Sequence, residues 1–172
     1  KKIYFSLVSV LLASLALAQC DGRYQTEIFT NVTVIQDVNF SDVYTDGEHE
    51  MDIYLPDGDT VTNRPVILYM HGGSFYAGNK TDGDCVAFCT AFAKKGYVTA
   101  SVNYRLVNPL LIISFLASHE EQYEEVLKAV ADIKAAIRFF RKDHANGDNY
   151  GIDPNTIFVG GTSAGAVAAI HM

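Results

Sequence analysis

The segment that most constrains the fold of this chain lies near its end, at residues 156–172. Residues 156–159 (Thr-Ile-Phe-Val) predict a buried strand, and the small residues from Ala164 onward predict a helix. Between them stands the sequence Gly-Thr-Ser-Ala-Gly at residues 161–165. Its glycines allow a sharp turn from strand to helix, because a side chain at either position would clash with the adjacent strand or helix. We expect this turn to expose the hydroxyl of Ser163.

Strand and helix patterns alternate along the rest of the chain. Five strands are expected, the first two half exposed and the other three buried on both faces: 32–40, 51–55, 66–70, 97–102 and 156–159. Three helices are expected: 82–95, one that follows a capping box at Ser118 and Glu121 and runs past Phe140, and 164–172. This alternation implies an α/β fold with a mainly parallel sheet and helices on both faces. Such sheets bind ligands beyond the carboxyl ends of their strands.

A second glycine motif directly follows the strand at 66–70. Residues 71–75 are His-Gly-Gly-Ser-Phe, so both motifs stand at carboxyl ends of predicted strands. A turn after a parallel strand aims consecutive backbone N–H groups at a developing negative charge, and each such donor contributes about a hundred- to a thousandfold in rate. The amino end of the helix after Ser163 favours the same charge. Together the two motifs predict an acyl-transfer site.

With these motifs, residues 50–172 resemble the α/β-hydrolase superfamily, specifically its carboxylesterase and lipase branch with the His-Gly-Gly loop. Three more segments match: Asn-Tyr-Arg-Leu at 103–106, Asp-Ile-x-Ala-Ala-Ile-x-Phe-Phe at 132–140 and Gly-Ile-Asp-Pro at 151–154. The resemblance implies an α/β-hydrolase fold, of which this chain is the N-terminal part, ending after the nucleophile elbow. It also implies the site residues: Ser163 as nucleophile, and the backbone N–H groups of Gly73, Ser74 and Ala164 as the oxyanion hole.

The chain departs from the family pattern at two positions in the motifs. Ser74 replaces a common glycine, which keeps the N–H but reduces the conformational freedom of the loop. Thr162 stands where cholinesterase-type enzymes carry Glu, which favours the hormone-sensitive-lipase-like or feruloyl-esterase-like side of the branch. In the family the triad acid and the general-base His follow the serine, so both are expected beyond Met172. We therefore expect this chain to be nearly inactive alone, since losing the base costs on the order of a millionfold in turnover.

None of the five histidines is a convincing base for Ser163. His171 lies further along the same helix, which carries it away from the hydroxyl, and His71 is expected to shape its loop through hydrogen bonds. The other three are expected on the solvated surface: His49, His119 and His144. Two aspartates are expected to be structural, Asp132 on the polar side of its helix and Asp153 at the start of a strand, away from the site.

The apolar run at residues 110–116 has no single interpretation. It follows the strand at 97–102 and its Asn-Tyr-Arg-Leu segment, so it lies near the predicted site in the chain order. A wall of an acyl pocket, part of a lid and a packed connection all remain open.

Residues 1–18 are typical of a secretory signal peptide. Two lysines precede an uncharged apolar run that ends in Ala-Leu-Ala, with small residues where a signal peptidase requires them. The run is too short to favour a permanent membrane span. Cleavage before Gln19 would leave a secreted or periplasmic protein with one domain at 19–172. Lipid attachment at Cys20 is less favoured, because Gln19 is larger than the residue usual before such a cysteine.

Charge and cysteine content exclude several classes of partner. Without the two N-terminal lysines, 11 of the 13 basic residues remain against 20 acidic ones, a net charge of −9. This disfavours nucleic acid and anionic membrane surfaces. Cys85 and Cys89 lie four apart on a predicted helix and are expected to be small core residues. No cluster of Cys or His predicts a metal, and the chemistry needs no cofactor.

The sequence therefore predicts a secreted serine hydrolase that cleaves small-molecule carboxylic esters through an acyl-enzyme on Ser163. A serine peptidase of the same fold is the alternative within the enzyme class. A non-catalytic α/β-hydrolase-like binding protein is the alternative from another class, although such proteins commonly lose the nucleophile. The identity of the ester and the oligomeric state stay open.

Overall fold

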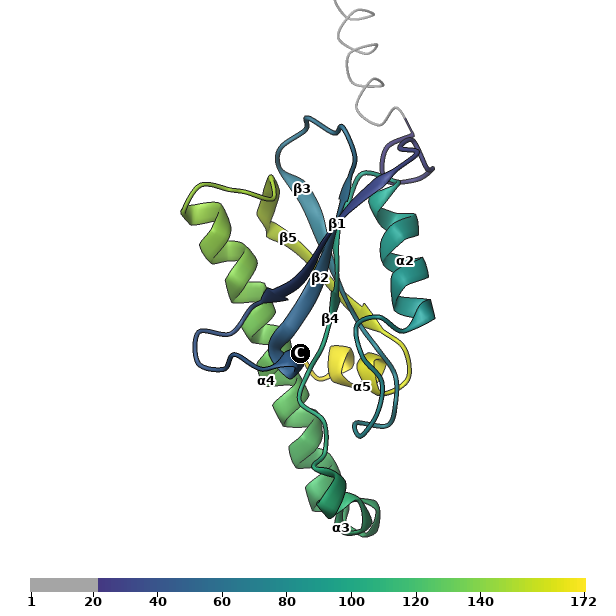
Figure 1. Cartoon of the computed structure of the whole chain (residues 1–172), viewed down its shortest axis with the longest axis vertical. Coiled ribbons are helices and arrows are strands. Elements are labelled where there is room, and N and C mark those ends of the chain that lie inside the picture. Colours follow the sequence, from purple (N-terminus) through teal and green to yellow (C-terminus); the bar gives the residue numbers. More distant parts are fainter. Residues whose placement is uncertain (1–21) are drawn as a thin grey trace, which may run out of the picture.

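The computed structural model describes residues 22–172 (Figure 1). The predicted signal peptide at 1–18, its cleavage site and Cys20 lie outside the described residues. The strands are β1 (Val32–Asn39), β2 (Glu50–Pro56), β3 (Arg64–Met70), β4 (Val98–Val102) and β5 (Ile152–Gly161). The helices are η2 (Gly47–His49), α2 (Gly83–Ala93), η3 (Pro109–Leu111), α3 (Ile112–Ala117), α4 (His119–Ala145) and α5 (Ala164–Ile170). Within this part of the chain, no helix is long and apolar enough to cross a membrane.

The strands form one sheet in the order β1-β2-β4-β3-β5. β2 is antiparallel to both β1 and β4, whereas β3 is parallel to both β4 and β5. The sheet is therefore mixed, and the expected parallel pairing is confined to β4, β3 and β5. Met70 at the end of β3 is paired with Gly161 at the end of β5. The two segments that follow these strands consequently leave the sheet side by side.

Helices cover both faces of the sheet, which confirms the predicted α/β class (Figure 1). α2 packs against β2, β3 and β4, while α5 contacts α4, β3 and β5. The main apolar core lies between the sheet and the α4–α5 pair. A smaller cluster of Tyr54, Cys89 and Ala93 lies under α2. Cys85 and Cys89 are free, fully buried thiols, as expected of small core residues.

The prediction that β2 is half exposed is wrong. Ile53 is buried in the main core, and Asp52 and Tyr54, which point to the opposite face, are buried as well. That face is covered because Tyr54 packs against Cys89 of α2 and Asp52 binds the ammonium group of Lys80. Alternate residues of β2 therefore face two buried environments, the main core on one side and α2 with Lys80 on the other, rather than core and solvent.

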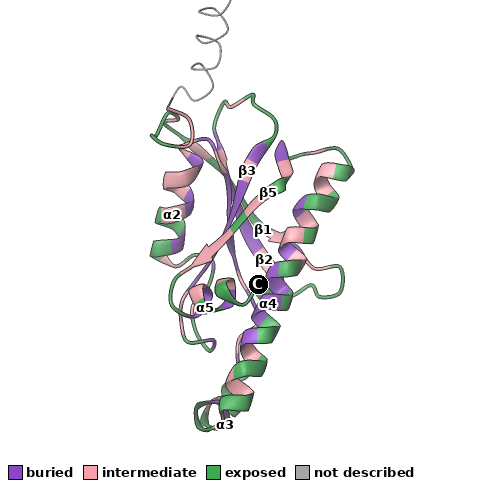
Figure 2. Ribbon diagram, turned by 180° about the vertical axis from the view of Figure 1, so that it is seen from behind, coloured by how far each residue is buried: buried purple, intermediate pink, exposed green. Residues whose placement is uncertain are grey.

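β5 was expected to be buried and is instead largely half exposed (Figure 2). It forms one edge of the described sheet, where β3 is its strand neighbour, and Phe158 is 53% exposed. The apolar run at 156–159 thus predicts the presence of a strand correctly, but not how far its side chains are buried. An edge strand of this kind presents backbone groups without a strand partner.

α4 begins and packs much as its pattern predicts. The Ser118 hydroxyl accepts a hydrogen bond from the backbone N–H of Glu121 at 3.3 Å. The Glu121 carboxylate accepts from the hydroxyl of Ser114 at 2.5 Å rather than from the backbone of Ser118, so one half of the predicted capping box forms. The apolar stripe faces the core, with four residues buried and Ile137 partly buried: Val126, Val130, Ile133 and Phe140.

Candidate active site

Ser163 occupies a sharp turn between β5 and α5. Its backbone has φ 50° and ψ −113°, and the residue is exposed. A Cβ on Gly161 would lie 2.7 Å from the carbonyl oxygen of Met70, and one on Gly165 would lie 2.5 Å from the same atom. These approaches confirm that the turn excludes side chains at both glycines. A positive φ in a non-glycine residue costs of the order of 1–3 kcal/mol, so the surrounding structure must hold Ser163 in place.

The His-Gly-Gly loop is also a tight turn with left-handed backbone. Gly73 has φ 115°, and its carbonyl accepts hydrogen bonds from the N–H groups of Tyr76 and Ala77 at 3.1 and 3.0 Å. A Cβ on Gly73 would lie 1.9 Å from the carbonyl oxygen of Ala77, so a side chain is excluded. Ser74 and Phe75 have φ 54° and 65°. Where the family commonly has glycine, Ser74 therefore adopts a conformation that glycine would adopt without strain.

The two motifs meet in space. A Cβ built on Gly72 would lie 3.4 Å from the Cβ of Ser163 and 3.3 Å from the carbonyl oxygen of Thr162. Among the described residues, no acceptor is hydrogen-bonded to the backbone N–H of Gly73, Ser74 or Ala164. The structure thus brings the loop against Ser163, while the assignment of these three N–H groups to an oxyanion hole stays a prediction.

His71 shapes the loop, as the sequence predicts. It is almost fully buried, its ring stacks on Tyr104 with centroids 4.4 Å apart, and its Nδ1 lies 2.6 Å from the carbonyl oxygen of Gly72. The hydroxyl of Tyr104 in turn donates to the carbonyl of His71 at 2.9 Å. Burial lowers the pKa of His71, which favours a neutral ring whose Nδ1–H donates to Gly72.

Two side chains that the sequence analysis did not select lie against the elbow. The hydroxyl of Tyr69 is 2.7 Å from Thr162 Oγ1, which donates to the carboxylate of Asp84 at 2.7 Å. These residues come from β3, the elbow and the first turn of α2, so the contact joins elements distant in sequence. In the sequence, Asp84 is notable only as an acidic residue at the start of a predicted helix, which indicates an interaction with the helix N-terminus and not a contact with the elbow.

Of the other histidines, His119 is exposed, as predicted, and His144 is half-buried beside Asp148. His171 and Asp153 also lie as predicted. His171 caps the far end of α5, where its Nδ1 lies 2.8 Å from the carbonyl oxygen of Val167. Asp153 accepts hydrogen bonds from Asn155 and Thr156 at the start of β5, as expected of a structural residue.

His49 was expected on the solvated surface and is buried, with 2% exposure. Its ring stacks under Tyr44, and its Nδ1 lies 2.6 Å from a carboxylate oxygen of Asp46. Asp132 was expected on the polar side of α4 and is also buried, because it accepts hydrogen bonds from the backbone N–H and the guanidinium of Arg105. Its structural role is confirmed, but its environment was mispredicted.

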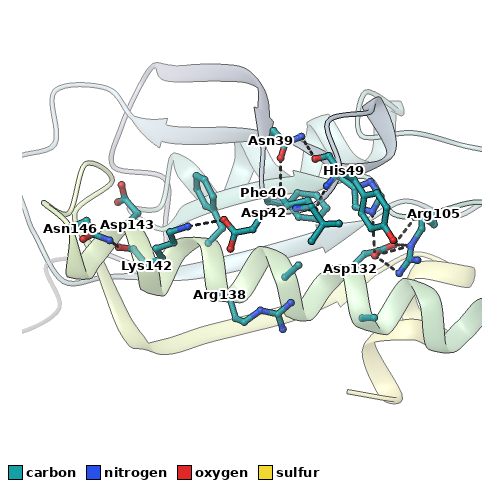
Figure 3. A pocket seen from close by; sticks show the side chains of 16 residues that line it. Asn39, Phe40, Asp42, His49, Arg105, Asp132, Arg138, Lys142, Asp143 and Asn146 are labelled. Atoms are coloured by element: carbon teal, nitrogen blue, oxygen red, sulfur yellow. Dashed lines mark hydrogen bonds and ion pairs between the residues drawn. The ribbon is translucent and has the colours of Figure 1, made fainter.

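A cavity of about 710 Å³ lies beside this cluster (Figure 3). It is lined by the segment between β1 and η2 and by α4, and the ion pair between Asp42 and Lys142 lies along it. His49, Arg105 and Asp132 close one end. Ser163 is not among the lining residues, so this cavity is not the candidate active site.

The apolar run after β4 forms η3 and α3, and it is not a fully packed connection. Leu110, Ile113 and Leu116 are 90%, 85% and 60% exposed, whereas Phe115 is buried. The ring of Phe115 lies edge-on to that of Tyr76, just beyond the His-Gly-Gly loop, with centroids 6.5 Å apart. This segment therefore presents apolar side chains to solvent, while its buried Phe115 contacts the residue that follows the His-Gly-Gly loop.

The fold and the paired motifs define an α/β-hydrolase of the carboxylesterase-like class. The BD-FAE family model matches residues 51–172, and the chain belongs to this family. Gut esterase 1 of Caenorhabditis elegans is 31% identical over 110 residues, which cover 63% of this chain and 18% of that protein. Para-nitrobenzyl esterase of Bacillus subtilis (strain 168) is 31% identical over 122 residues, or 69% of this chain and 22% of that protein. The chain thus spans about a fifth of the length of these curated relatives.

Solved structures agree with this assignment. A structure described as a truncated form of carbohydrate esterase from gut microbiota is 26% identical, with a TM-score of 0.58, and covers 87% of this chain and 45% of that one. Esterase B from Lactobacillus rhamnosis is 20% identical, with a TM-score of 0.56 over 95% of this chain and 47% of that one, and shows the same fold. The resemblance inferred from the motifs is confirmed.

Proposed function

We propose that the protein hydrolyses carboxylic esters through an acyl-enzyme formed on Ser163. The observation that carries the proposal is the geometry of this serine. It is exposed on a positive-φ turn at the amino end of α5, and the His-Gly-Gly loop lies against it with a Gly72 Cβ position 3.4 Å from Ser163 Cβ. The naming of several relatives as esterases supports the same reaction.

In the proposed reaction, Ser163 Oγ attacks the ester carbonyl carbon and the carbonyl oxygen becomes an oxyanion. The backbone N–H groups of Gly73, Ser74 and Ala164 stabilise that charge. The serine proton passes to a general-base His, which is expected after the serine in chain order from the family resemblance, and from it to the departing alcohol. Water then attacks the acyl-enzyme, releasing the carboxylic acid and restoring the Ser163 hydroxyl.

A fluorophosphonate probe on the full-length protein tests this proposal. The expected result is stoichiometric labelling of the wild type and none of the Ser163→Ala variant, together with hydrolysis of p-nitrophenyl acetate by the wild type alone. Labelling with cleavage of peptides but not of esters would favour the serine peptidase. A wild type that is not labelled, or a Ser163→Ala variant labelled equally, would favour a non-catalytic binding protein and refute the esterase.

We also propose that the protein is exported, with residues 1–18 as its signal peptide. The support is the sequence pattern alone: two lysines, an uncharged apolar run and small residues before Gln19. N-terminal sequencing of the protein recovered from the medium or periplasm is expected to begin at Gln19. Recovery from the cytoplasm with Lys1 and Lys2 still present would contradict export.

A further inference from the structure

The residue before the nucleophile is held at its backbone and at its side chain. The N–H of Thr162 donates to the carbonyl of Met70 at 3.1 Å, and its own carbonyl accepts from the N–H of Gly165 at 2.9 Å. Its hydroxyl contacts Tyr69 and Asp84, each at 2.7 Å. β3, α2 and α5 therefore all contribute to fixing this one residue.

The hydrogen bonds of the side chains have a defined direction. A carboxylate only accepts, so the single hydroxyl proton of Thr162 goes to Asp84. Thr162 Oγ1 is then the acceptor for Tyr69, and the chain runs from Tyr69 through Thr162 to Asp84. The Tyr69 ring is itself fixed by stacking on Phe88 of α2, with centroids 4.0 Å apart and planes 17° apart.

The hydrogen-bonded chain from Tyr69 to Asp84 lies next to Ser163, whose backbone conformation is strained. Relaxing the Ser163 φ of 50° requires the peptide between Thr162 and Ser163 to rotate or the backbone of Thr162 to shift. The first movement breaks the hydrogen bond from Gly165 N–H to the Thr162 carbonyl, and the second breaks the contacts of the Thr162 side chain with its two partners. Both hydrogen bonds of that side chain are exposed to solvent, so each contributes less than a buried one, but their combined free energy is of the same order as the cost of one strained residue. The hydrogen bonds of Thr162 are therefore strong enough to shift the conformational equilibrium of the elbow toward the strained form of Ser163.

We infer that Thr162 is a positioning residue, and that its hydrogen-bonded chain with Tyr69 and Asp84 keeps Ser163 in its strained, exposed conformation. This inference rests on the proposed esterase function and goes beyond it. It assigns a positioning role to the hydroxyl of Thr162, at a position where cholinesterase-type enzymes carry Glu. Thr162 acts through Ser163 and does not itself touch the ester.

The test uses the full-length protein and p-nitrophenyl acetate. Thr162→Val keeps the shape but loses both hydrogen bonds, so kcat should fall about tenfold while KM stays within about twofold of wild type. Thr162→Ser keeps the hydroxyl, and its kcat should return to within about twofold of wild type. Tyr69→Phe removes one donor, and kcat should fall about threefold.

Two matched controls make the same chemical changes elsewhere. Thr60→Val and Tyr123→Phe alter exposed residues whose hydroxyls make no hydrogen bond within residues 22–172, and both should keep the wild-type kcat. A Thr162→Val enzyme with wild-type kcat overturns the inference. A Thr162→Ser enzyme as slow as Thr162→Val also overturns it, because the hydroxyl is then not the group that acts.

A second measurement reports on the chain without any ester. The hydrogen bond from Thr162 is the largest cause that lowers the pKa of Asp84 below 3.8, so Thr162→Val should raise that pKa in an NMR titration of the carboxyl group. An unchanged Asp84 titration overturns the contact itself. A wild type that is neither labelled nor active refutes the proposed function. An active wild type combined with an unchanged kcat in Thr162→Val refutes this inference alone.

Discussion

Replacing Lys80 by methionine removes a buried charge from the segment that follows the His-Gly-Gly loop. The Lys80 ammonium lies 2.5 Å from a carboxylate oxygen of Asp37 and 2.6 Å from one of Asp52. The side chains of Lys80 and Asp52 are only 8% and 2% exposed. Within the described residues, the one other hydrogen bond to the Asp52 carboxylate comes from the backbone N–H of Asp37 at 3.0 Å. The variant therefore leaves a buried carboxylate with a single neutral donor.

The magnitude follows from this geometry. Removing one member of a buried ion pair typically costs about 3–5 kcal/mol. Asp37 is 68% exposed, so it regains water and adds little to the cost. The Asp52 carboxylate keeps the hydrogen bond from the Asp37 backbone N–H, which places the expected loss near the lower limit, at about 3 kcal/mol. Methionine retains the apolar stem of Lys80, so the loss reports the charge rather than the packing.

Urea denaturation of the full-length protein, followed by far-ultraviolet circular dichroism, measures this loss. Lys142→Met is the matched control, because Lys142 also pairs with an aspartate, Asp42 at 2.7 Å, but the two side chains are 64% and 81% exposed. Exposed pairs contribute little, so the control should unfold close to wild type. If Lys80→Met shifts the unfolding midpoint no more than Lys142→Met does, the argument from burial is refuted.

The contacts of Lys80 with Asp37 and Asp52 also predict how the stability of the protein depends on pH. Burial alone would lower the pKa of Lys80, but the hydrogen bonds to Asp37 and Asp52 outweigh burial and raise it above 10.5. The charged folded form is favoured, so its stabilisation is fully present below the unfolded-state pKa and is lost as the pH rises through the folded one. The difference in stability between wild type and Lys80→Met should therefore shrink only in strongly alkaline solution.

Three further predictions concern the motifs and the core. Gly165→Ala should abolish fluorophosphonate labelling, because its Cβ would lie 2.5 Å from the carbonyl oxygen of Met70; labelling at the wild-type rate would contradict this. Burial lowers the pKa of His71 below 6.5, so the unfolded chain binds the proton more readily and stability should fall as the pH drops below 6.5. Urea midpoints should show this decline in wild type and a shallower one in His71→Gln, and equal declines would contradict it. Burial raises the pKa of both Cys85 and Cys89 to about 12, so iodoacetamide at neutral pH should modify neither thiol before unfolding, as mass spectrometry can establish.

The elbow was predictable because its determinants are local. An apolar strand, two glycines that exclude side chains and a helix of small residues lie within residues 156–172. The meeting of the two motifs has a different origin. It depends on β3 lying between β4 and β5, which pairs Met70 with Gly161, and the sequence pattern predicts parallel strands without settling their order. The position of both motifs at carboxyl ends of predicted strands carried that part of the prediction, and the family resemblance added to it.

The error at Asp132 has a physical cause in the packing of α4. On α4 the buried face is wider than the large apolar residues show, because Ala129 and Ala136 are fully buried beside Asp132. Small residues let the segment carrying Arg105 approach the helix, and the guanidinium then satisfies the Asp132 carboxylate. A stripe of large apolar side chains marks the centre of such a face but not its edges. Polar residues at those edges are buried when a partner from a distant segment arrives.

Backbone strain is the part of the site that the sequence shows least. Within residues 22–172, three of the seven non-glycine residues with positive φ lie in the two motifs: Ser74, Phe75 and Ser163. Such strain persists only when the surrounding structure fixes it, and here the fixing groups are side chains from other elements. Lys80 anchors the chain after the loop to β1 and β2, and Thr162 links the elbow to β3 and α2. The glycines show where the chain turns, whereas the sequence does not show that Ser74, Phe75 and Ser163, in the two motifs of the proposed site, are held against their own backbone preference.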